Sequence, residues 1–201
     1  MGIEIFVFCF LRIIIDLEII AIDPYLADTI SKVSAENVFV WILIAGVFAL
    51  ATYVLYRNGK LKATAAIAVP VLAFYIAFVL TITMIEREVT ATQTYNLSVF
   101  WTYRAIADGK TDLIMEIVWN IVLFIPIGVL INYLIPIKYF WISIISSLFF
   151  SAGIEFMQLV LRRGLFEFDD MIHNTVGAML GIVIFAIVSL AVKKFVQSSQ
   201  K

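Results

Sequence analysis

Four stretches of this chain contain no charged residue for 19 to 23 consecutive positions, and this feature limits its fold most. They cover residues 38–56, 63–85, 117–137 and 174–192, and a fifth stretch, 139–161, carries only the charge of Glu155. An α-helix needs about 20 apolar residues to cross the core of a bilayer. Hydrophobic residues make up 63% of the chain, against roughly 45–50% in soluble domains. We therefore predict an all-α, polytopic transmembrane helical bundle with five spanning helices.

Residues 3–22 are less regular. On a helix, the charged residues of this region fall on one half of the surface: Glu4, Arg12, Asp16, Glu18 and Asp23. That pattern fits an amphipathic helix in the membrane interface, and it equally fits a sixth spanning helix whose charges face the bundle. The basic start and the small-residue cleavage site of a signal peptide are missing.

Cysteine, histidine and net charge exclude several kinds of site. Cys9 and His173 are each the only residue of their type. The sequence thus excludes a disulfide within the chain and a metal site built from several thiolates or imidazoles, and we expect no cofactor. A net charge of −1 argues against a nucleic-acid partner.

The distribution of basic residues predicts the orientation. Lys and Arg next to membrane spans favour the cytoplasmic side. One cluster, Arg57, Lys60 and Lys62, lies between the first two uncharged stretches, and Lys193 and Lys194 follow the last one. Counting spans puts both clusters on one side, so we expect the C-terminus in the cytoplasm and the 86–113 and 162–172 connections outside.

Polar residues from three consecutive spans are predicted to lie at one depth. With a rise of about 1.5 Å per residue, Asn120, Glu155 and Asn174 should all lie roughly 6–11 Å below the outer boundary. Glu155, Gln158 and Arg162 share one helix face, and so do Asp170, Asn174, Gly177 and Gly181. This arrangement predicts a polar pocket that opens outward.

Several of these residues also have plain structural interpretations. Asn120 and Asn174 could bond across helices, and Gly177 and Gly181 have the spacing that allows close helix packing. Arg162 could simply extend its charge to the interface. We expect one carboxylate of the Asp169–Asp170 pair to cap a helix, whereas the other could hold a cation or an ammonium group. Glu155 is a functional candidate, because a carboxylate inside a membrane is costly.

Three ordered motifs resemble those of the VanZ-like family, over roughly residues 83–192. Asn120 to Gly128 is similar to its N-x-x-x-F-x-P-x-G segment, in which Pro126 and Gly128 are expected to kink the helix. The pair Glu155 and Gln158 is similar to its E-x-x-Q helix. The last motif begins at Asp170 and is similar to D-x-x-x-N-T-x-G-G; its matching residues are Asp170, Asn174 and Gly177.

The sequence departs from the family pattern at two positions. Val99 stands where the N-L-x-P-F element has proline, and Ala178 stands where the last motif has its second glycine. The resemblance implies N-terminal helices outside the family region (1–60), a VanZ-like membrane domain (61–196) and a cytoplasmic tail (197–201). It implies the plasma membrane of a bacterium, typically Gram-positive, since the founding member lowers sensitivity to teicoplanin, a glycopeptide that acts outside the membrane.

Three functions are consistent with these observations. The first is a non-enzymatic envelope protein that affects glycopeptide action by binding a lipid-linked precursor or a lipoglycopeptide. Its ligand-binding residues would be Asn120, Glu155, Gln158, Arg162, Asp169, Asp170 and Asn174. The second is an intramembrane enzyme with Glu155 or Asp170 as general base, although familiar hydrolase motifs are absent. The third is a small transporter. Membrane lipids are expected partners in each case.

Overall fold

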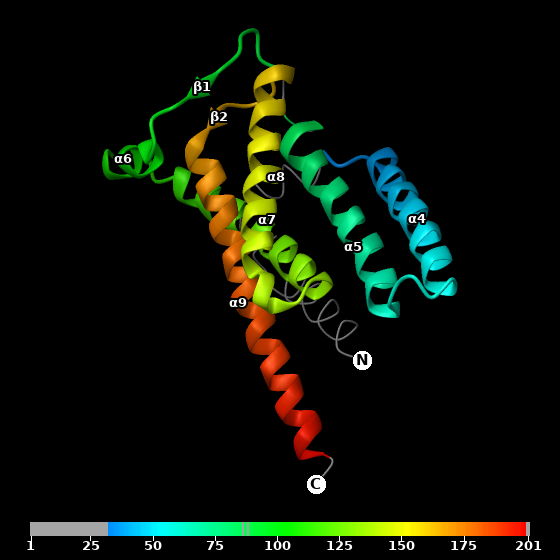
Figure 1. Ribbon diagram of the computed structural model, residues 1–201. Coiled ribbons are helices and arrows are strands. Elements are labelled where there is room, and N and C mark those ends of the chain that lie inside the picture. The colour runs from blue at the N-terminus through cyan, green and yellow to red at the C-terminus, as the bar shows by residue number, and fades with distance from the viewer. Residues whose placement is uncertain (1–31, 86, 88, 200–201) are drawn as a thin grey trace.

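The computed structural model describes residues 32–85, 87 and 89–199 (Figure 1). Five helices in this part of the chain are long and apolar enough to cross a membrane, which confirms the predicted all-α bundle. Segment 3–22 lies outside the described residues. The elements are α4 (Ala35–Arg57), α5 (Ala63–Leu80), π-helix η1 (Thr81–Ile85), β1 (Tyr95–Asn96), α6 (Trp101–Ala107), α7 (Leu113–Leu134), 3-10 helix η2 (Ile137–Tyr139), α8 (Phe140–Leu161), β2 (Phe166–Glu167) and α9 (Phe168–Ser198).

Helices α4 and α5 form a hairpin that is joined by a polar contact near each end. Pro70 has no N–H to donate to the carbonyl of Ala66, and Thr52 Oγ1 from α4 lies 3.0 Å from that oxygen. At the other end of the hairpin, the indole of Trp41 donates to Thr81 Oγ1 at 2.8 Å. Backbone groups in lipid find no water, so a hydroxyl beside an interrupted helix stabilises it.

Helix α7 continues through Pro126 as one helix from Leu113 to Leu134. The hydroxyl of Tyr75, on α5, donates to the carbonyl of Leu123 at 2.9 Å, three residues before the proline. This bond ties α5 to α7 where proline weakens the helical ladder. The kink expected at Pro126 stays a prediction. The buried apolar core lies where α5, α7 and α8 meet: Val79, Phe124, Ile127 and Ile154.

Glycines bring α7 and α9 into backbone contact. A Cβ added at Gly177 or Gly181 would lie 2.1 Å from a carbonyl oxygen of α7, and one at Gly128 would lie 2.1 Å from the carbonyl oxygen of Ala178. No side chain fits at such distances. Figure 1 shows α9 running beside α7 from the same end of the bundle.

The connections at one end of the bundle pair with each other. β1 and β2 form a two-stranded parallel sheet. Before it, the N–H of Thr90 donates to the carbonyl of Arg162 at 2.8 Å, and Thr94 Oγ1 donates to the carbonyl of Gly164 at 2.8 Å. We call this end, which carries residues 89–112 and 162–167, the loop end.

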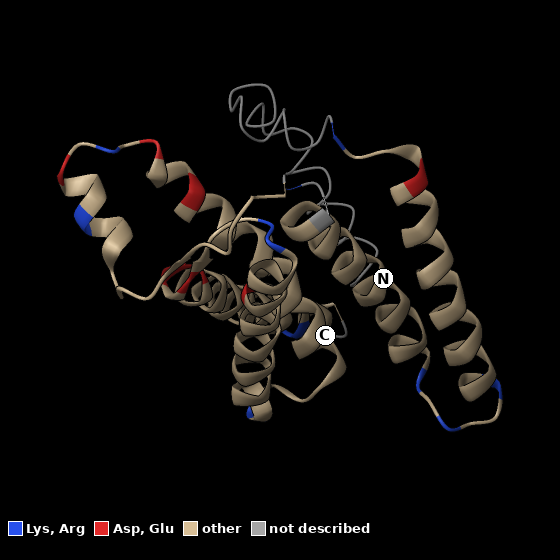
Figure 2. Ribbon diagram, turned by 90° about the horizontal axis from the view of Figure 1, so that it is seen from above, with Lys and Arg blue, Asp and Glu red and all other residues tan. Residues whose placement is uncertain are grey.

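The basic clusters lie at the other end. Figure 2 shows blue segments at the α4–α5 turn, and in Figure 1 this turn and the end of α9 point away from the loop end. This is the arrangement expected from counting spans; which end faces the cytoplasm stays a prediction. Helix α9 continues to Ser198, so the tail predicted at 197–201 begins inside the helix.

Candidate functional site

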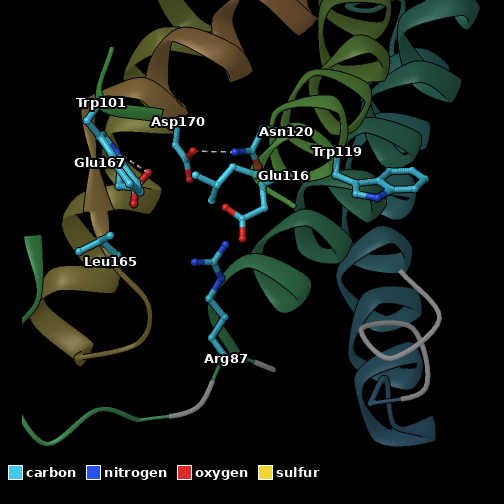
Figure 3. A pocket seen from close by; sticks show the side chains of 9 residues that line it. Arg87, Trp101, Glu116, Trp119, Asn120, Leu165, Glu167 and Asp170 are labelled. Atoms are coloured by element: carbon cyan, nitrogen blue, oxygen red, sulfur yellow. Dashed lines mark hydrogen bonds between the residues drawn. The ribbon is translucent and has the colours of Figure 1, made fainter. Parts of the chain in front are cut away.

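A cavity of about 300 Å³ lies at the loop end, between the starts of α7 and α9 (Figure 3). Charged side chains and the indole of Trp101 converge on it from four parts of the chain. Its lining residues are Arg87, Trp101, Leu113, Glu116, Trp119, Asn120, Leu165, Glu167 and Asp170. Of the predicted ligand-binding residues, Asn120 and Asp170 therefore line this cavity.

Asn120 and Asp170 join α7 to α9 at the cavity wall. The Asn120 amide donates to Asp170 Oδ1 at 2.7 Å. His173, one turn further along α9, has its Nδ1 3.9 Å from the same oxygen, and its Nε2 lies 3.0 Å from the Tyr103 hydroxyl. The Asn120 amide therefore holds the Asp170 carboxylate against α7, and Tyr103 on α6 holds His173 beside it.

Glu155 lies behind the cavity and supports it. Its side chain is 1% exposed, and its Oε2 accepts the backbone N–H of Glu167 at 2.9 Å. The Glu167 carboxylate then reaches the cavity, where Oε2 accepts the Trp101 indole N–H at 3.2 Å. The pKa of Glu167 is raised from 4.5 to about 7, mainly because the carboxylate is buried and secondly because the Asp170 carboxylate lies nearby.

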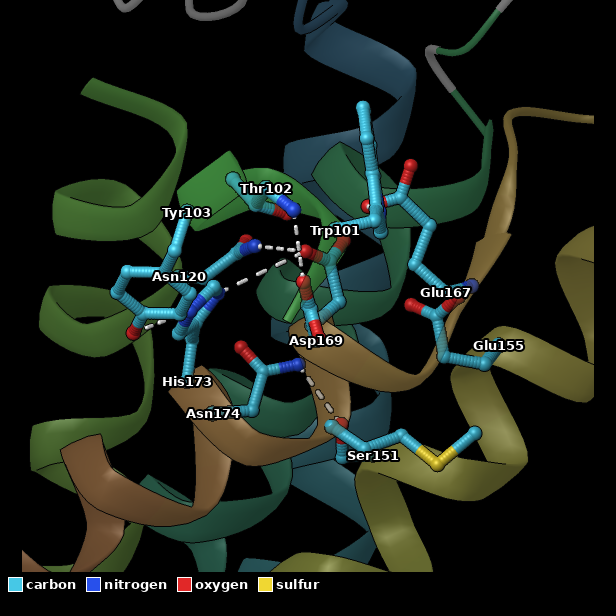
Figure 4. Close-up of polar contacts among 12 residues, drawn as sticks. Trp101, Thr102, Tyr103, Asn120, Ser151, Glu155, Glu167, Asp169, His173 and Asn174 are labelled. Carbon is cyan, nitrogen blue, oxygen red and sulfur yellow. Dashed lines mark hydrogen bonds and ion pairs between the residues drawn. The ribbon is translucent and has the colours of Figure 1, made fainter. Parts of the chain in front are cut away.

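Asp169 binds backbone rather than cavity (Figure 4). One carboxylate oxygen accepts the N–H of Phe100 at 2.6 Å and the other accepts the N–H of Thr102 at 3.0 Å. We expected one carboxylate of this pair to cap the helix that it begins, and this is wrong: no side chain caps α9. Asp169 instead caps the start of α6. A fully buried carboxylate needs such donors, and Phe100 meets it at a left-handed φ of 61°.

The other predicted residues also lie outside the cavity lining. The Gln158 amide donates to the carbonyl of Thr83 in η1 at 2.9 Å, and the Asn174 amide donates to Ser151 Oγ at 2.8 Å. Arg162 is exposed beyond the end of α8, with Nη1 3.5 Å from the carbonyl of Ala91. Of the three residues predicted to share one pocket, Asn120, Glu155 and Asn174, only Asn120 lines the cavity.

Four cavity residues were not predicted as site residues: Arg87, Trp101, Glu116 and Trp119. Arg87 and Trp101 belong to a long connection whose sequence has no regular pattern. Periodicity therefore could not predict that this connection folds back to the start of α9. Glu116 and Asn120 are at i and i+4 and share one face of α7, which was the available signal. Figure 3 shows the Arg87 side chain pointing toward Glu116.

The charge of the cavity determines what it can hold. Three carboxylates, Glu116, Glu167 and Asp170, face one guanidinium, Arg87, and the indole of Trp101. The indole of Trp119 points away from these groups (Figure 3). Such a site suits groups that donate hydrogen bonds, such as amines and hydroxyls. In the described part of the chain, no three His, Cys, Asp or Glu residues are grouped to hold a metal ion.

A comparison with protein families matches residues 71–189 to the VanZ/LLP1 model. The chain belongs to the VanZ/LLP1 family. The matched region contains every residue that lines the cavity, as well as the glycine contact between α7 and α9. No match was found among curated proteins or among solved structures.

Proposed function

We propose that this VanZ/LLP1-family protein is a non-enzymatic component of the bacterial cell envelope. It resides in the plasma membrane and lowers sensitivity to glycopeptides such as teicoplanin by binding a lipid-linked or lipophilic ligand in the cavity at its loop end. The observation that carries the proposal is the cavity itself, with three carboxylates, one guanidinium and the Trp101 indole at the end of a membrane bundle.

The size and chemistry of the cavity support a headgroup-sized ligand. About 300 Å³ is at the lower end of the range for small-molecule pockets. Amine or hydroxyl groups of the ligand would donate to Glu116 and Asp170, and a ring would pack on Trp101. With the basic end in the cytoplasm, this site faces outward, where glycopeptides act.

The alternative of an enzyme has less support. A general base must reach the proton that it removes, but Glu155 is buried and its Oε2 already accepts the N–H of Glu167. Asp170 is the one of the two candidate bases that lines the cavity. An enzyme would therefore depend on Asp170, and the lining residues include no Ser, Thr, Cys or Lys as a neighbouring nucleophile.

Expression in a glycopeptide-sensitive Gram-positive host tests the proposal. The parent protein, Glu116→Gln, Asp170→Asn and the control Asp108→Asn are compared for the minimal inhibitory concentration of teicoplanin, with membrane levels measured for each. Asp108 is an exposed carboxylate just after α6 and outside the cavity. The parent and the control should raise this concentration, and the two cavity variants should not.

An unchanged response to teicoplanin from a well-expressed parent would contradict the role in resistance. Lipid extracts of the same strains test the alternative. A chemically altered envelope lipid that depends on Asp170 would favour the enzyme over the binding protein.

A further inference from the structure

A second hollow, of about 490 Å³, lies between the end of α5 and helix α8. Leu80 and Met84 form one side of it, and Phe149, Gly153 and Met157 form part of the other. All its lining side chains are apolar. We call it the α5–α8 groove. It shares no lining residue with the cavity described above.

The groove has the depth of one lipid leaflet. From Met157 to Phe149 it follows α8 for about 12 Å, and it begins about 9 Å before Arg163, at 1.5 Å per residue. The hydrocarbon core of a leaflet is about 15 Å thick, half of the bilayer value. An acyl chain entering beside Arg163 would therefore run along the groove from the leaflet next to the loop end to about the middle of the bilayer.

Gly153 keeps the groove open. A Cβ added at Gly153 would meet nothing within 4 Å, whereas Gly177 and Gly181 are filled by the backbone of α7. Phe149 is 73% exposed at the rim, and the methionines are flexible enough to adapt to a chain. Gly153 thus marks space on the lipid-facing side of α8 and not a helix contact.

One arginine, Arg163, contacts the lining of the groove at its loop end. Arg163 Nη1 is 3.4 Å from the carbonyl of Met84, a lining residue, and 3.2 Å from the carbonyl of Arg87. These contacts hold the guanidinium at the rim. Arg162 precedes it at a left-handed φ of 55° and is exposed. Guanidinium groups bind phosphate through paired hydrogen bonds.

From this combination we infer a second binding site, for one anionic phospholipid. An acyl chain lies in the α5–α8 groove, and the phosphate lies against Arg162 and Arg163. The opposite charges of phosphate and arginines, joined to an apolar groove of leaflet depth, favour this occupant over a zwitterionic lipid. The site is separate from the proposed glycopeptide role, since the cavity residues take no part in it.

Photolabelling in vesicles tests the inference. The protein is reconstituted with phosphatidylglycerol or phosphatidylcholine carrying a diazirine in the acyl chain, and labelled peptides are mapped by mass spectrometry. Phosphatidylglycerol should label the peptides containing Met84 and Met157 more strongly. Gly153→Leu should reduce this labelling several-fold, and Gly46→Leu should not, because Gly46 is also an open helical glycine but lies on α4.

Arg162→Gln should remove the preference for phosphatidylglycerol without filling the groove, so it tests the site even if Gly153→Leu does not fold. Asp170→Asn should leave the labelling unchanged, which separates this site from the cavity. Equal labelling by the two lipids, or full labelling of Gly153→Leu, would overturn the inference. So would a Phe149→p-benzoylphenylalanine variant that crosslinks to residues 1–31 or to a second copy instead of lipid.

Discussion

Replacing Gly177 by alanine should separate α7 from α9 and destabilise the whole protein. The added Cβ would lie 2.1 Å from the carbonyl oxygen of Ile121, whereas ordinary contact begins at 3.4 Å. The helices must therefore move apart by about 1 Å or more, because backbone and not a flexible side chain blocks the space. Gly181 and Gly128 make equally close contacts, so the helices cannot pivot around one of them.

The size of the effect follows from overpacking. Extra methyl groups in a packed interior cost about 1–3 kcal/mol, and each kcal/mol lowers the melting temperature by roughly 2–4 °C for a protein of this length. The separation also stretches the bond between Asn120 and Asp170, now 2.7 Å, beyond hydrogen-bonding distance. We expect Gly177→Ala to melt roughly 2–12 °C below the parent.

The assay is thermal unfolding of the purified protein in detergent, followed by circular dichroism. Gly153→Ala is the matched control, since it also adds one methyl group to a spanning helix but meets nothing within 4 Å. Alanine is the better helix former by up to about 1 kcal/mol, so the control should melt at or slightly above the parent temperature. If Gly177→Ala and Gly153→Ala have the same melting temperature, the backbone contact between α7 and α9 is refuted.

Two further predictions concern the loop end. Asp169→Ala leaves the N–H groups of Phe100 and Thr102 without their acceptor, at a cost of about 1–3 kcal/mol. Amide hydrogen exchange should therefore accelerate more in α6 than in the spanning helices. An equal acceleration in all helices would argue against a local cap. The pKa of Glu167 is raised to about 7, so its contribution to stability is full below pH 4.5 and disappears as the pH rises through 7. Glu167→Gln, which retains an acceptor for Trp101, should reduce the loss of melting temperature between pH 5 and pH 8, and an identical pH dependence in parent and variant would count against this carboxylate.

The spanning helices could be predicted from the sequence because long uncharged stretches leave few alternatives in a membrane. The depth estimate brought Asn120 near the start of α9, where it bonds Asp170. It could not show which partner each polar side chain would choose. Glu155 binds the N–H of Glu167 and Asn174 binds Ser151, and such pairings depend on helix rotation and on loops that periodicity does not describe.

The cavity depends on the connection between η1 and α7, which the sequence left unresolved. Arg87 and Trp101 reach the cavity because this connection pairs with the segment after α8, through β1 and β2. A parallel pair of two residues has no recognisable pattern in a sequence. The role of Asp169 was equally hidden, since the backbone donors of α6 that it binds lie 67 to 69 residues away in the chain.

Native mass spectrometry of the protein purified from a Gram-positive host membrane tests most directly whether the cavity binds a ligand. The parent and Asp108→Asn are predicted to carry the same additional mass, which Glu116→Gln and Asp170→Asn lose while remaining folded. A folded parent without any bound mass, or equal retention by all four proteins, would contradict the proposed ligand site.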